Sequence, residues 1–81
     1  MSEEKIVLEY PFKDNGAEVT EVNMRRAKVK DMRIAEEKSK SSGGNYESIL
    51  FANLCELSPD AMDLIDIKDY GKLQARYQSF L

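Results

Sequence analysis

Few residues in this chain could do chemistry by their type. There is one cysteine, Cys55, and no histidine, so the commonest general base and the commonest metal ligand are both missing. A cysteine nucleophile needs an activated thiolate, and the chain has no histidine to activate one. We therefore interpret Cys55 as a small, buried hydrophobic residue, and a single cysteine cannot form an internal disulfide.

Four aspartates recur at every third position near the C-terminus and could suggest a metal site: Asp60, Asp63, Asp66 and Asp69. Neither the spacing nor the glycine of a calcium-binding EF-hand accompanies them. Asp66 and Asp69 are better explained as helix-start residues, because carboxylates there accept hydrogen bonds from free backbone N–H groups. The other acidic residues are scattered over predicted helix starts and exposed faces. The sequence predicts no metal, no cofactor and no catalytic site, so we do not expect an enzyme.

The adjacent glycines Gly43 and Gly44 could suggest a loop that binds phosphate. The spacings that such loops require, GxGxxG or GxxxxGK followed by serine or threonine, are both absent. Serine and glycine dominate residues 39–44, and such residues bury little and resist ordering. We therefore expect a flexible loop here, placed at residues 41–45 between two helices.

The composition is that of one small domain at residues 1–81. Hydrophobic residues make up 42% and charged residues 33% of the chain, which suits a folded protein. The net charge of -3 predicts no binding to nucleic acid or to an anionic membrane. The first residues, MSEEK, lack the basic start and apolar run of a signal peptide, and no run approaches the roughly 18 apolar residues of a membrane span. We expect a soluble protein that stays where it is made.

Residues 5–25 are predicted to form a β-hairpin, because apolar and polar residues alternate before and after the turn sequence DNG at residues 14–16. A two-residue turn at residues 15–16 would divide the apolar side chains of the two strands between opposite faces. A three-residue loop brings them together on one face, so we predict that loop. The pairs expected in this register are Leu8 with Val22, Ile6 with Met24, and Glu9 with Glu21.

Helices are predicted for the rest of the chain. A charge-rich helix at residues 29–40 has only a sparse apolar face. A helical unit follows at residues 46–81, where polar side chains that accept from backbone N–H groups mark three helix starts. These caps are Asn45, Ser58 with Pro59 behind it, and Asp66. The apolar residues of the first helix are Val29, Met32, Ala35 and Ile34.

These elements predict an α+β fold in which an N-terminal two-stranded antiparallel β-hairpin packs against three to four short helices. Two strands alone are marginally stable in water, so helices must cover their apolar face. The helix at residues 46–56 is apolar around much of its circumference, which is typical of a central or interfacial helix. Gly71 lies inside the last helix and suggests close approach of another backbone. The apolar face of that helix consists of Ile67, Tyr70, Leu73, Tyr77, Phe80 and Leu81.

The order and spacing of several segments resemble the tail assembly chaperone family of tailed bacteriophages, in the group that serves Mu-like and other contractile-tailed phages. The resemblance covers about Lys5 to Leu81 and is to the short form found in that family. The matching segments are the turn at residues 14–16, Val22-x-Met24-Arg25, Lys30-Asp31-Met32, Ala35-Glu36, Leu57-Ser58-Pro59, Ile67 with Asp69-Tyr70, Gln74, and Phe80-Leu81.

This resemblance implies a small, non-enzymatic assembly factor in the cytoplasm of a bacterial host that is absent from the mature virion. It implies one main partner, the tape measure protein, a long helical polypeptide that must stay soluble until tail tube subunits polymerise around it. Tail tube subunits and further copies of the chain are additional candidate partners. Two other functions stay open, a structural tail completion protein of the virion and a host-directed protein-binding adaptor.

Contact with such a client would use apolar helical surface that the small core does not consume. The alternative for each apolar residue is that it fills the core of the monomer. Our candidates for client contact or self-association are Phe51, Cys55, Tyr77, Phe80 and Leu81.

Overall fold

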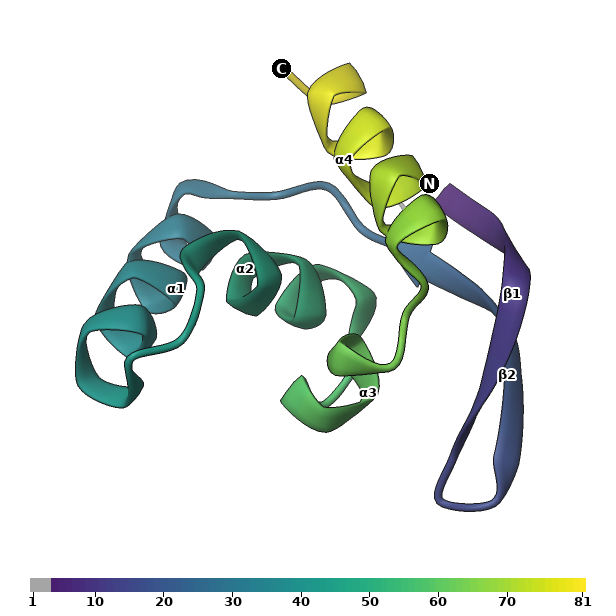
Figure 1. Ribbon diagram of the computed structural model, residues 1–81. Helices are drawn as coiled ribbons and strands as arrows, with labels where there is room; N and C mark the ends of the chain where they lie inside the picture. Colours follow the sequence, from purple (N-terminus) through teal and green to yellow (C-terminus); the bar gives the residue numbers. More distant parts are fainter. Residues whose placement is uncertain (1–3) are drawn as a thin grey trace.

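The computed structural model describes residues 4–81 and shows a β-hairpin followed by four helices (Figure 1). The predicted α+β fold class is confirmed. Residues 1–3, which contribute to the N-terminal pattern discussed above, lie outside the described residues. The elements are β1 (Glu4–Asp14), β2 (Ala17–Met24), α1 (Val29–Ser42), α2 (Tyr46–Cys55), α3 (Pro59–Asp63) and α4 (Ile67–Ser79).

The hairpin turn is shorter than predicted. Asn15 and Gly16 have positive φ angles of 55° and 85°, and Asp14 pairs with Ala17. Positive φ at both central residues is the geometry of a two-residue type I′ turn, whose twist matches that of the flanking strands. The predicted three-residue loop is therefore wrong. The pairs derived from it are wrong as well, namely Leu8 with Val22, Ile6 with Met24, and Glu9 with Glu21.

An irregularity in β1 corrects the register that this turn would impose. Residues 8–11 of β1 stand opposite the single residue Thr20 of β2. Extra residues of this kind form a bulge, which bends the strand and changes the direction of its side chains. Ile6 consequently pairs with Val22. The structure buries Ile6, Leu8, Val22 and Met24. The prediction that these side chains face the core is therefore confirmed, although the predicted pairs are not.

The bulge is bound by Asp69 of α4. Asp69 Oδ1 accepts a hydrogen bond from the N–H of Glu9 at 2.8 Å, and Oδ2 accepts one from the N–H of Tyr10 at 2.9 Å. A bulge disrupts the ladder between strands, so its N–H groups need acceptors from elsewhere. The cap of α4 is Asp66, whose side chain accepts from the N–H of Lys68. The prediction that Asp69 serves as a cap is therefore wrong.

The helices begin where the capping residues predicted. The side chains of Asn45, Ser58 and Asp66 each accept a hydrogen bond from a backbone N–H group in the first turn of their helix. α1 begins at Val29 as predicted but continues to Ser42, beyond the predicted end at residue 40. Gly43 then ends it with a left-handed φ of 75°, a common helix terminator. The predicted loop at residues 41–45 is therefore limited to residues 43–45.

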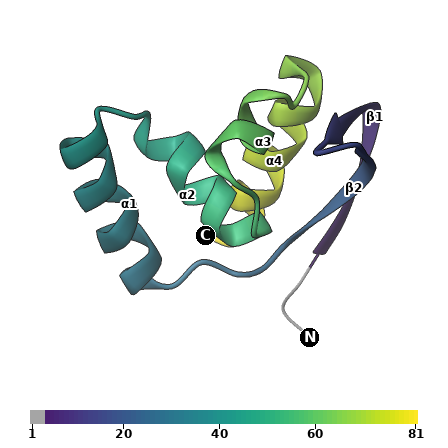
Figure 2. The same cartoon turned by 90° about the horizontal axis from the view of Figure 1, so that it is seen from below.

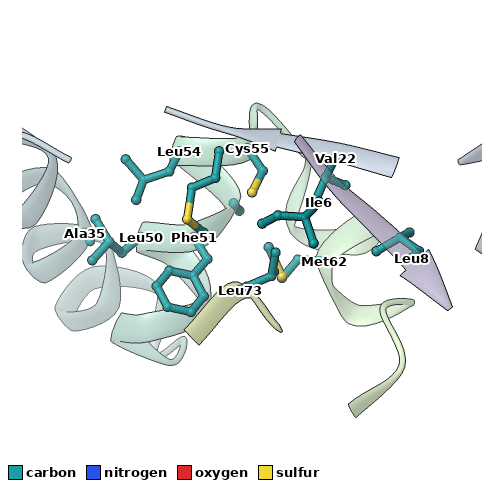
Figure 3. Packing of buried hydrophobic residues seen from close by; sticks show 12 residues of the cluster. Ile6, Leu8, Val22, Ala35, Leu50, Phe51, Leu54, Cys55, Met62 and Leu73 are labelled. Atoms are coloured by element: carbon teal, nitrogen blue, oxygen red, sulfur yellow. The ribbon is translucent and has the colours of Figure 1, made fainter. Parts of the chain in front are cut away.

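α2 is the central element of the fold. It packs against α1 on one side and against α3 and β2 elsewhere (Figure 2). Figure 3 shows its side chains between Ala35 of α1 and the hairpin residues Ile6 and Val22. The prediction that this helix is apolar around much of its circumference is confirmed by its buried residues, which are Leu50, Phe51, Ala52, Leu54 and Cys55.

α4 packs along β1 and buries only the middle of its predicted apolar face. Leu73 is fully buried, whereas Ile67 at the beginning of the helix is 81% exposed and Leu81 just beyond its end is 82% exposed. A Cβ added at Gly71 would meet no atom within 4 Å, so the predicted close approach of another backbone is wrong. The two ends of α4 therefore present apolar side chains to solvent.

Candidate functional site

Two of the five candidate contact residues belong to the core. The ring of Phe51 is fully buried and lies against Tyr70 and Tyr77, with centroid separations of 5.6 and 5.5 Å. Cys55 is also buried, and this burial raises the pKa of its thiol to about 12, so the thiol stays protonated at neutral pH. The chain itself covers both side chains, which agrees with the core-packing alternative.

The other three candidates lie together at the end of α4. Tyr77 and Phe80 are half-buried with ring centroids 6.5 Å apart, and Leu81 follows them. Arg26 completes the group, because its guanidinium lies 5.3 Å from the centroid of the Phe80 ring and donates to the Phe80 carbonyl oxygen at 3.1 Å. A cation over an aromatic face is attracted by the ring quadrupole, which fixes Phe80 from outside. We call Arg26, Tyr77, Phe80 and Leu81 the C-terminal aromatic surface.

A polar contact between α2 and α4 positions this surface. Glu47 Oε1 accepts hydrogen bonds from the Tyr70 hydroxyl at 2.8 Å and from Gln74 Nε2 at 3.0 Å. Burial and the Glu47 carboxylate both raise the pKa of Tyr70, so its hydroxyl stays protonated and donates. Leu73, which lies between Tyr70 and Gln74 in the sequence of α4, is fully buried. The middle of α4 is thereby fixed on α2, and the aromatic side chains beyond it have a defined position.

Sequence analysis missed a hollow between α1 and α2. It has a volume of about 580 Å³ and is lined by Val29, Met32, Arg33, Glu36, Ser39, Lys40 and Tyr46. Tyr46, at the start of α2, is 37% exposed, and its pKa is raised first by partial burial and then by Tyr77 and Glu36. Of the apolar residues predicted for the face of α1, Ala35 is buried, whereas Val29, Met32 and Ile34 are exposed. The sparseness of that apolar face was the signal for an uncovered helix.

A second hollow lies on another side of α2, also unpredicted. Its volume is about 450 Å³, and α1, α2 and α3 all contribute to it. Polar residues such as Lys38, Asn53 and Asp63 line it as well. An apolar depression with polar neighbours is a common form of protein-binding surface. Its apolar lining consists of Ile49, Ala52, Leu57, Pro59 and Met62.

The side chains of residues 4–81 do not gather into a group of three or more acidic or sulfur ligands that could hold a metal ion. Asp69 of the four-aspartate series faces β1 instead, where it binds the bulge. Over the same residues, each helix is too short or too polar to cross a bilayer.

The fold and its surfaces define a class of protein, a small α+β domain that exposes an aromatic surface and two apolar hollows suited to protein contacts. A family model described as phage tail assembly chaperone proteins, E, or 41 or 14, matches residues 5–81. The chain belongs to this family. Comparison of this chain with the curated proteins and with the solved structures found no match.

Proposed function

We propose that this phage tail assembly chaperone binds the tape measure protein in the host cytoplasm and keeps it soluble until tail tube subunits polymerise around it. The observation that carries this proposal is the family match over nearly the whole chain, which implies protein partners in tail assembly. A chaperone family also suggests a non-enzymatic role. A long helical client with apolar faces would otherwise associate with itself, and binding by a small acidic domain would prevent this.

The C-terminal aromatic surface is the part of the fold that we assign to the client. Tyr, Phe and Arg side chains are enriched in the parts of interfaces that dominate binding energy. Phe80 is held by Arg26, and Tyr77 by the Phe51 ring, so little side-chain freedom would be lost on binding. Leu81 projects beyond them and is available to an apolar helix face. This surface combines apolar area with a fixed geometry.

The proposal is tested by co-expression with the tape measure protein of the same phage, measuring the soluble fraction of that client. We expect Leu81→Ser to lower the soluble fraction and Phe80→Ser plus Leu81→Ser to lower it further. Ile67→Ser is the matched control, because Ile67 and Leu81 are 81% and 82% exposed at opposite ends of one helix. Both single substitutions should leave the free energy of unfolding within about 0.5 kcal/mol of wild type.

The outcomes separate the function from the surface. A wild-type chain that does not raise the soluble fraction of the tape measure protein contradicts the function. Solubilisation that survives the double substitution contradicts the C-terminal aromatic surface. In that case the client could bind the hollow of about 450 Å³ instead. Asn53→Arg places a long charged side chain in this hollow and should then abolish solubilisation of the client.

Whether the protein is part of the finished virion is measured separately. An assembly factor that acts before the tail is complete should be missing from purified virions, whereas a tail completion protein would be present in them. Mass spectrometry of virions should therefore detect the tape measure protein without this chain. A copy number comparable to that of tail components would favour a structural role instead.

A further inference from the structure

One side of α1 is an apolar surface that the rest of the chain leaves uncovered. Val29 is 68% exposed and Met32 is 44% exposed, and both line the hollow of about 580 Å³ together with Tyr46 of α2. The lining continues along α1 to Lys40. At a rise of 1.5 Å per residue, Val29 and Lys40 lie about 16 Å apart along the axis, which is the length of about three turns of a partner helix. A helix laid against α1 would therefore find apolar side chains over a matching length.

Cations surround the beginning of this hollow. Arg33 is part of its lining, and Lys28 and Lys30 flank Val29 in the sequence. A further hollow of about 600 Å³ is lined by Arg25, Arg26, Ala27, Lys28 and Lys30. Asp31 does not reduce the positive charge at the surface, since it is buried and paired with Arg25. We call the exposed cations Arg26, Lys28, Lys30 and Arg33 the basic rim.

The charge of the basic rim is not balanced nearby. Within residues 4–81, Lys30 and Arg33 form no ion pair, and Glu36 in the lining of the hollow pairs with Lys40 at 3.9 Å. Residues 25–40 carry a net charge of +4, and because the whole chain carries -3, the remaining residues carry -7. An acidic group is therefore attracted to the rim and repelled by the rest of the surface, which orients it.

The basic rim joins the hollow to the C-terminal aromatic surface. Arg26 belongs to both, because its guanidinium lies 5.3 Å from the centroid of the Phe80 ring and donates to the Phe80 carbonyl oxygen. Val29, where the hollow begins, is three residues further along the chain. Figure 2 shows the segment between β2 and α1 running past the C-terminus to the first turn of α1. One partner can therefore contact α1 and Phe80 at the same time.

From this arrangement we infer that the client segment recognised by the chaperone is an amphipathic helix with acidic side chains beside its apolar face. The apolar face lies on the hollow along α1, and the carboxylates lie on the basic rim. Apolar contact supplies affinity, and the charges fix the direction in which the helix binds. This inference rests on the proposed function and adds to it the chemistry of the segment that is bound.

The first test uses overlapping synthetic peptides, each about four helical turns long, that cover the tape measure protein of the same phage. Binding of each labelled peptide to the wild-type chain is measured by fluorescence anisotropy at about 0.05 M and about 0.3 M salt. We expect the tightest-binding peptides to have an apolar stripe of helical period flanked by Asp or Glu, and to bind more weakly at high salt. Tightest binding by basic or uncharged peptides overturns the inference. Absence of binding by every peptide, when the wild-type chain solubilises the full-length client, also overturns it.

Charge reversal identifies the surface that the acidic peptides use. Lys30→Glu plus Arg33→Glu should weaken their binding by about tenfold or more. Replacing the acidic residues of the peptide by lysine should restore binding to this variant, which also shows that the variant is folded. Lys5→Glu plus Lys13→Glu, at exposed positions of the hairpin, makes the same change in net charge and should leave binding unchanged. Equal losses in the two variants would assign the effect to overall charge and overturn the inference.

The apolar contact has a matched pair of substitutions on α1. Met32 and Ile34 are 44% and 40% exposed, and Met32 lines the hollow whereas Ile34 does not. Met32→Ser should lower the soluble fraction of the co-expressed tape measure protein, and Ile34→Ser should leave it unchanged. Equal effects of the two substitutions would contradict a client helix on this side of α1.

The outcomes separate this inference from the proposed function. A wild-type chain that does not raise the soluble fraction of the tape measure protein contradicts the function. A wild-type chain that raises it, with Lys30→Glu plus Arg33→Glu equally effective, contradicts the basic rim alone. Two other occupants would overturn the inference. Loss of binding to a labelled oligonucleotide in this variant would assign the rim to nucleic acid, and loss of concentration-dependent mass in sedimentation velocity would assign it to another copy of the chain.

Discussion

Two buried carboxylates, Asp31 in α1 and Asp69 in α4, hold two parts of the hairpin, the exit of β2 and the bulge of β1, by different chemistry. Asp31 is 2% exposed and binds the exit of β2 through a cation, with the Arg25 guanidinium donating from both terminal nitrogens at 2.8 and 2.9 Å. Asp69 is 0% exposed and binds β1 through two neutral backbone N–H groups. Each lies in the first turn of its helix.

The difference shows which part of the fold each aspartate positions. The partners of Asp31, which are Arg25 and the N–H of Lys28, lie within six residues of it, so the contact stabilises a local connection. Asp69 pairs with Lys72 one turn away at 3.4 Å, but its two β1 partners are about sixty residues away. Those two N–H groups are free donors because β1 contains a bulge. Asp31 therefore fixes the start of α1, whereas Asp69 fixes how α4 and the hairpin meet.

Removing the Asp69 carboxylate should have the largest effect. Asp69→Ala leaves two N–H groups of β1 without their charged acceptor, and each such loss costs about 1.5–3 kcal/mol. We expect the free energy of unfolding to fall by about 3–5 kcal/mol, measured by urea denaturation. Asp69→Asn keeps one acceptor oxygen and should lose less. A loss below about 1 kcal/mol for the alanine variant would show that Asp69 does not hold the bulge.

Removing the charge of Asp31 should have a smaller effect. Asp31→Asn keeps an acceptor for the Lys28 N–H but loses the paired charge opposite Arg25, so we expect a loss of about 2 kcal/mol. Arg25→Lys should lose part of this, because an ammonium cannot make the two parallel hydrogen bonds of a guanidinium. A loss for Asp31→Asn as large as that for Asp69→Ala would contradict the predicted order of the two effects.

The pH dependence should come from both acids, with Asp31 the better defined. The hydrogen bonds from Arg25 lower the pKa of Asp31 to about 2, against the effect of burial. Burial alone would raise the pKa of Asp69, but the N–H groups of Glu9 and Tyr10, together with the Lys72 ammonium, reverse this and lower it. A lowered pKa in the folded state stabilises the protein above the unfolded-state pKa of about 4, and this contribution is lost as the pH falls through the folded-state value.

The corresponding measurement is the free energy of unfolding between about pH 5 and pH 2. Asp31 should contribute a decrease of about 2 kcal/mol over this range, from its shift of almost two pKa units at 1.36 kcal/mol each. Asp31→Asn should flatten the curve by that amount. An unchanged curve in this variant would show that Asp31 titrates normally in the folded protein.

Gly71→Ala should have the smallest effect, and of opposite sign. Gly71 lies two residues beyond Asp69 in α4, and an added Cβ meets no atom within 4 Å. Alanine is favoured over glycine in a helix interior by about 1 kcal/mol, so the melting temperature should rise. A fall would indicate that a backbone does approach α4 closely here.

These contacts also show why some features were predictable and others were not. Asn45, Ser58 and Asp66 act on N–H groups two or three residues away, so their identity and position were sufficient to predict three helix starts. Asp69 has the same local pattern as a cap, and no short-range signal distinguishes its true role. The burial of Phe51 and Cys55 depends on how many elements pack against α2. The apolar pattern of α2 does not specify that number.

The sequence by itself determined the order of strands and helices, the helix starts, the side chains of the hairpin that face the core, and the family. The elements depend on capping, turn chemistry and periodicity, which operate over a few residues, whereas the family was indicated by a resemblance in the order and spacing of motifs. Only the tertiary structure decided the register of the hairpin, the role of Asp69 and the exposed ends of α4. The physical reason is that a two-residue turn and a continuous apolar face conflict locally. A bulge resolves that conflict because a carboxylate from a distant helix accepts hydrogen bonds from the N–H groups that the bulge releases.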